Sequence, residues 1–115
     1  MLNLGVLASG RGSNSQSIID EIEKGRINAR IRLLIVDNSA AFAIARAKKH
    51  SIEHLYLNPR EFLEKDDLYI RIARELKARD VGLVILAEPF ISLVMLPYFL
   101  GLLGLFGGII TVIFA

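Results

Sequence analysis

Short apolar runs alternate with amphipathic segments along the first three quarters of this chain. Four of the runs predict buried strands, because they are apolar at consecutive positions and end at turn-forming residues; they cover residues 3–8, 30–36, 53–57 and 82–87. Between them, apolar positions recur at helical spacing over residues 13–24, 40–50 and 59–78. Strands and helices that alternate across short turns predict an α/β fold, Rossmann-like and doubly wound around a mostly parallel sheet.

Residues at the helix ends support these boundaries. Gly25 follows the first helical pattern, where a glycine C-cap is common. Asn58 can cap the third helix, Pro59 suits the first helical position, and Glu61 stands where a capping box places its acid. We therefore expect one continuous helix from residue 59 to about residue 78.

The last quarter of the chain is almost uncharged. All basic residues lie at or before Arg79, and Glu88 is the only charged residue after Asp80. The segment 89–115 exceeds the roughly 20 apolar residues of a membrane span, but a proline and four glycines interrupt it. We expect an apolar helix and a strand at 108–114 that complete the sheet or form an interface, with self-association through 89–115. A membrane-associated segment is the alternative.

Composition excludes several classes of protein. A length of 115 residues fits one domain, and the lack of cysteine excludes a disulfide framework or a thiolate metal site. The net charge of +2 is too small to favour nucleic acid as a partner. The N-terminus has no basic region before its apolar run, so it is not a secretory signal. A cytoplasmic protein without a metal is expected.

One turn carries most of the candidate chemistry. In residues 7–17, LASGRGSNSQS, a predicted strand runs through a glycine turn into a predicted helix. Gly10 and Gly12 permit positive φ and close approach of the backbone to a ligand. The helix N-terminus favours an anion such as phosphate, and Ser13 or Asn14 can cap the helix or bond a phosphate oxygen. The simpler interpretation is a tight turn without a ligand.

The same turn leaves a nucleotide-binding module open as an alternative. It is not a P-loop, because no Gly-Lys-Ser/Thr follows. It reads G-x-G-x-x-S, with Ser15 where the dinucleotide fingerprint has glycine or alanine. Asp37 stands about 25 positions further on, near the place of an acidic ribose-binding residue. Asp37 can equally cap the following helix.

Residues 7–20, LASGRGSNSQSIID, resemble the start of the glycinamide ribonucleotide (phosphoribosylglycinamide) formyltransferase family, whose usual form is S-G-x-G-S-N-L-Q-x-I-I-D. The similarity continues through IVDNSAAFAIARAKKHSIE at 35–53 and LVILA at 83–87. The resemblance implies formyl transfer from 10-formyltetrahydrofolate in purine biosynthesis, on a truncated formyltransferase fold. Residues 1–88 would form its phosphoribosyl-binding half-domain, and 89–115 an apolar tail.

The resemblance also implies roles for single residues. Gly10, Gly12, Ser13 and Asn14 would hold the substrate phosphate, since they match the family's phosphate-binding turn. Lys65 falls near a position where the family often has arginine, and it would contact the folate cofactor.

The chain departs from the family at the catalytic strand, whose motif is I-I-N-I-H-P. Here Thr111 replaces the asparagine that polarises the formyl carbonyl, and Ile113 replaces the histidine that assists proton transfer. The family's catalytic aspartate would lie beyond Ala115. We therefore assign no catalytic residue and expect a catalytically incomplete enzyme. His50 and His54 are expected on the surface or in the core.

Overall fold

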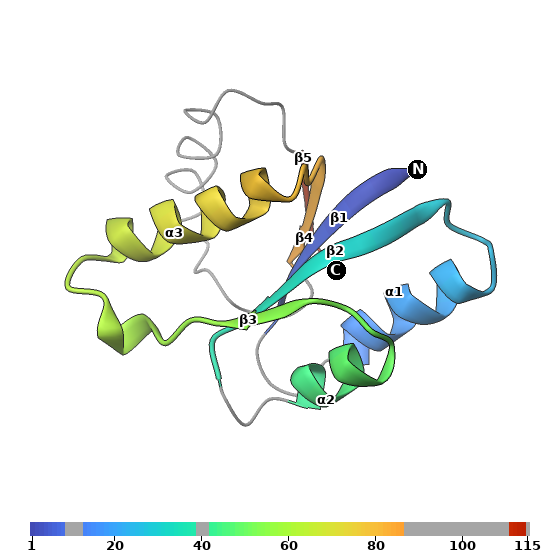
Figure 1. The fold of residues 1–115 in the computed structure, drawn as a ribbon, viewed down its shortest axis with the longest axis horizontal. Coiled ribbons are helices and arrows are strands. Elements are labelled where there is room, and N and C mark those ends of the chain that lie inside the picture. Colours follow the sequence, from blue (N-terminus) through green and yellow to red (C-terminus); the bar gives the residue numbers. More distant parts are fainter. Residues whose placement is uncertain (9–12, 39–41, 87–110, 115) are drawn as a thin grey trace.

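The computed structural model describes residues 1–8, 13–38, 42–86 and 111–114, which form a parallel sheet covered by helices on both faces (Figure 1). The strands are β1 (Leu2–Ala8), β2 (Ala29–Val36), β3 (His54–Tyr56), β4 (Leu83–Leu86) and β5 (Thr111–Phe114). Their order in the sheet is β3-β2-β1-β4-β5, and every neighbouring pair is parallel. This order confirms the doubly wound α/β fold.

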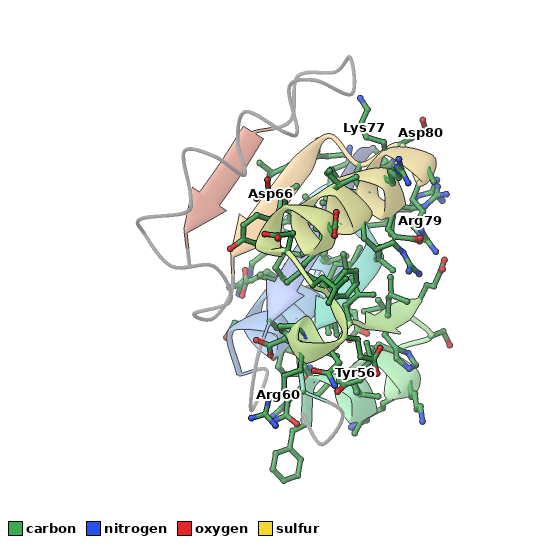
Figure 2. The ribbon with its side chains drawn as sticks, turned by 90° about the vertical axis from the view of Figure 1, so that its left-hand side faces the viewer. Tyr56, Arg60, Asp66, Lys77, Arg79 and Asp80 are labelled. Atoms are coloured by element: carbon green, nitrogen blue, oxygen red, sulfur yellow. The ribbon has the colours of Figure 1, made fainter. Side chains whose placement is uncertain are left out.

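The helices are divided between the two faces of the sheet. They are α1 (Ser13–Glu23), α2 (Phe42–Lys49) and α3 (Lys65–Ala78). In Figure 1, α3 covers one face, whereas α1 and α2 cover the other. The strands run towards the left of that view, so Figure 2, seen from the left, looks at the edge where they end.

Each face of the sheet has its own hydrophobic core. On the α3 side, Leu7 and Ile35 of the sheet are buried together with Ile72 and Leu76 of the helix. On the other side, Val6, Ala8, Leu34 and Val36 are buried with two alanines of α2. Because both faces are covered, the strands are apolar at consecutive positions instead of alternating.

The helix boundaries agree with the expected ones except in the third helix. Gly25 has a φ of +75°, as a glycine that ends a helix commonly does. The expectation of one helix from 59 to 78 is wrong, because a short 3-10 helix, η1 (Pro59–Glu61), precedes α3. Asn58 caps η1 by accepting the N–H of Arg60 at 3.0 Å.

The break between η1 and α3 has a physical cause in the core. Phe62 leaves the helix with φ −104° and ψ 125°, and its ring packs against the cluster under α3. Glu64 is also extended, with φ −119° and ψ 144°. Asp66 and Asp67 then lie in the first turn of α3, where negative charge suits the helix dipole. Packing of one half-buried aromatic ring against this core thus divides the predicted helix in two.

An ionic cluster ties the end of α3 to the start of β3. Arg79 donates from Nη1 to Glu75 Oε2 at 2.8 Å and from Nε to Glu53 Oε2 at 3.0 Å. Its guanidinium holds the pKa of both carboxyls below their usual range, against the opposing effect of burial. Figure 2 shows Arg79 together with Lys77 and Asp80 at this end of the helix.

The end of the chain joins the sheet. The expected strand at 108–114 is present as β5, with Thr111 opposite Leu83 and Phe114 opposite Leu86. The expected apolar helix falls in residues 87–110, which lie outside the described residues, so the division after residue 88 stays a prediction. In the part of the chain that the structure describes, no helix has the length and hydrophobicity to cross a membrane.

Gly5→Ala should destabilise the fold. A Cβ at this position would lie 2.5 Å from Leu76 Cδ2 and 3.1 Å from Val81 Cγ1, both in buried side chains. Overpacking of this kind costs about 1–3 kcal/mol of unfolding free energy. Urea denaturation measures the loss, with Gly82→Ala as control, since its Cβ would meet only Leu2 Cδ1 at 3.8 Å. Equal stability of the two variants would contradict the prediction.

The full chain should self-associate through segment 89–115. This segment has no charged residue, and β5 stands at one edge of the described sheet, where a strand can pair with another chain. Sedimentation velocity without detergent should give a dimer or larger species for the full chain and a smaller species for a 1–88 fragment. A monodisperse monomer for the full chain, with an unfolded fragment, would show that the segment is internal core.

Candidate functional site

The strand order places a topological switch point at the carboxyl edge of the sheet. From β1 the chain crosses to β2 through α1 on one face, whereas it enters β4 from α3 on the other face. The connections therefore diverge between the carboxyl ends of β1 and β4. Ligands of open α/β sheets bind at such a topological switch point.

The glycine turn joins two elements that meet at this switch point. β1 ends at Ala8 and α1 begins at Ser13, so only residues 9–12 join them. Gly10 and Gly12 lie outside the described residues, and Ser13 and Asn14 are described only by their position at the start of α1. The N-terminal N–H groups of this helix have no partner within the helix and face the carboxyl edge. The phosphate-binding roles of these four residues stay predictions.

A hydrogen-bonded side chain fixes α1 one turn beyond the candidate turn. Gln16 Oε1 accepts a hydrogen bond from Arg46 Nη1 of α2 at 3.1 Å, and its Nε2 donates to Asp20 Oδ1 at 2.8 Å. The start of α1 is therefore held against α2 by specific polar contacts. Sequence analysis did not assign this role to Gln16, although the residue belongs to the G-x-G-S-N-x-Q pattern.

Asp37 and Asn38 follow β2 at the same edge. Asp37 is half-buried and Asn38 is exposed. Both already interact with other groups of the chain. The structure thus brings Asp37 to the edge that holds the glycine turn, a position that fits both the ribose-binding and the helix-capping interpretations.

The end of β3 and the start of α3 lie at the same edge. Figure 2 shows Tyr56 and Arg60 near this edge, with Asp66 at the near end of α3. Lys65 is the first residue of α3, but its side chain lies outside the described part, so its contact with a folate stays a prediction. Further along the helix, burial raises the pKa of the Tyr69 hydroxyl, and the Asp66 carboxylate adds to this effect.

Both histidines lie outside the glycine turn, although His50 Nε2 is 3.4 Å from Gln16 Nε2. His50 follows α2, and its Nδ1 is 2.6 Å from Glu23 Oε1. His54 is the first residue of β3, and it pairs in register with Leu34. Thr111 and Ile113, the replacements for the family's catalytic pair, lie in β5 beside β4. Across the described residues, no group of three or more potential metal-ligating side chains comes together.

Comparison with known proteins agrees with this geometry. The family model described as "Formyl transferase" matches residues 2–98. Phosphoribosylglycinamide formyltransferase from Dictyostelium discoideum is 39% identical over 66 residues, which are 57% of this chain and 32% of that protein. The enzyme of the same name from Haemophilus influenzae is 36% identical over 90 residues, which are 76% of this chain and 41% of that protein.

A solved structure gives the same result for the fold. The phosphoribosylglycinamide formyltransferase from Bacillus halodurans superposes with a TM-score of 0.78 at 28% identity, over 94% of this chain and 53% of that one. This chain thus spans between about a third and about half of the length of these relatives. By the family match across most of its length, the chain belongs to the formyl transferase family.

Proposed function

We propose that this chain binds the phosphate of phosphoribosylglycinamide at residues 9–14, as part of formyl transfer in purine biosynthesis. The observation that carries the proposal is the position of this turn, between the central strand β1 and the N-terminus of α1 at the switch point. A glycine turn at a helix N-terminus suits a phosphate dianion, because the first N–H groups of a helix have no partner within the helix. The similarity to enzymes named phosphoribosylglycinamide formyltransferase supports this choice of substrate.

In the proposed reaction, the substrate amine attacks the formyl carbon of 10-formyltetrahydrofolate. A C–N bond forms to the amine and the bond from the formyl carbon to the folate nitrogen breaks. The amine loses one proton, and the folate nitrogen gains one. The chain would contribute positioning, because anchoring the phosphate fixes the distance between the amine and the edge of β4 and β5. We propose that Lys65 contacts the folate and that the protein acts in the cytoplasm.

We further propose that this chain binds substrate better than it turns it over. Thr111 can donate a hydrogen bond, as the family's asparagine does, but its side chain is shorter. Ile113 has no group that can carry a proton, and general acid–base groups contribute about 10²–10⁴-fold to rate. Binding and chemistry are therefore separable in this chain.

Gly12→Val should abolish binding of phosphoribosylglycinamide. A β-branched side chain disfavours positive φ and keeps a ligand away from the backbone. Isothermal titration calorimetry of the full chain measures the affinity, and circular dichroism checks that the variant is folded. Gly82→Ala is the matched control, because its Cβ would meet only an ordinary contact at 3.8 Å.

Two results of this experiment would overturn the proposal. Unchanged affinity in Gly12→Val would show that the turn does not hold the phosphate. Binding of NAD in preference to phosphoribosylglycinamide would favour a nucleotide-binding module, with Asp37 at the ribose.

Turnover by the chain should be far below ordinary enzyme rates of roughly 1–10³ s⁻¹. The physical reason is the lack of a proton-carrying group at Ile113. Spectroscopic assay of folate release under saturating substrate measures the rate, while calorimetry on the same sample confirms that substrate is bound. A rate within the ordinary range would show that the catalytic residues lie elsewhere.

A further inference from the structure

A cavity of about 300 Å³ opens beside the start of β2, whereas the glycine turn follows the carboxyl end of β1. It lies where the last turns of α1, the start of β2 and the segment after α2 meet, on the right-hand side of Figure 1. Its apolar wall consists of four isoleucines: Ile19, Ile22, Ile31 and Ile52. Of these, Ile19 is buried and the other three are half-buried, so they leave apolar surface towards the cavity.

Polar groups stand at the rim of this cavity. Arg30 donates from Nε to Asn3 Oδ1 at 3.2 Å, and its two Nη groups have no hydrogen-bond partner among the described residues. Glu23 contributes a carboxylate, but His50 binds it at 2.6 Å. Arg30 is therefore the cation at the rim whose donors are available to a ligand.

The surroundings of the rim are basic. Lys24 follows α1, and Lys48 and Lys49 lie in the last turn of α2, all with exposed side chains. Arg26 is also exposed, but it is paired with Glu21 at 3.5 Å. The local field thus favours an anion over a cation.

Size and shape narrow the chemistry of the ligand. A volume of about 300 Å³ lies at the lower limit of small-molecule sites, and apolar walls with a few polar groups are typical of them. The planar guanidinium of Arg30 matches a carboxylate through two parallel hydrogen bonds. A phosphate dianion has no apolar body to cover the isoleucines, and its second charge would approach Glu23.

We propose that this cavity, lined by Ile19, Ile22, Ile31 and Ile52, binds a small amphipathic carboxylate through Arg30. The branched or aromatic body of the ligand lies on the isoleucines, and its carboxylate receives the Nη donors of Arg30. The site is at the opposite edge from the glycine turn, so it does not depend on the proposed function.

The test uses the full chain with isoleucine δ1 methyl groups labelled for NMR. The probes are 4-methylpentanoate and its neutral isostere, 4-methylpentanamide. We expect saturable shifts of the methyl signals of Ile19, Ile31 and Ile52 with the acid, at an affinity at least about tenfold above that of the amide. Arg30→Gln should reduce the affinity for the acid to that for the amide.

Arg74→Gln is the matched control, because it removes the same charge from an exposed position on α3, across the sheet. It should leave the preference for the acid unchanged. Gly12→Val should also leave it unchanged, which separates this site from the phosphate site.

Three outcomes would overturn the proposal. The first is the lack of saturable methyl shifts up to about 20 mM acid, because the affinity would then be weaker than millimolar. The second is equal affinity for the acid and the amide in the unsubstituted chain. The third is the same loss of preference in Arg74→Gln as in Arg30→Gln, which would indicate attraction by net charge alone.

Discussion

β1 pairs with β2 along one edge over seven positions and with β4 along its other edge over four, and both of its faces are buried from Leu4 to Ala8. A parallel strand in this position needs a crossover on each side, because parallel neighbours cannot be joined by tight turns. The crossovers place α1 on one face and α3 on the other, and they separate at the carboxyl end of β1. The glycine turn lies at that point, so the candidate site is a consequence of this double pairing.

The burial of the sheet between helices on both faces also explains why the strands could be predicted from the sequence. Strands buried on both faces must be apolar at consecutive positions, and this gave clear runs at β1, β2 and β4. The boundary that sequence reasoning missed lies between η1 and α3. Asn58 and Pro59 are correct signals for a helix start, but the same signals suit a single 3-10 turn. The break comes from packing of the half-buried Phe62 against the core under α3, a tertiary contact that local patterns do not contain.

Some features of the candidate site follow from local sequence, whereas others depend on tertiary packing. The position of Ser13 and Asn14 at the start of α1 follows from local spacing, and so does the place of Asp37 after β2. The bond between Gln16 and Arg46 spans 30 positions in the chain, and it depends on how α1 and α2 pack on the sheet. The isoleucine cavity comes from three separate segments for the same reason. Contacts of this kind are set by tertiary packing, which a single sequence does not display.

The place of β1 in the sheet also sets the order in which this chain is completed during synthesis. When residue 57 has emerged from the ribosome, β1, β2 and β3 can pair, and two helices can cover one face. The far edge of β1 and the face awaiting α3 remain open until β4 emerges at residues 83–86. At about 5–20 residues per second, this interval lasts on the order of a few seconds. During that time the nascent chain presents its central strand, which is buried in the complete fold, to chaperones and to other chains.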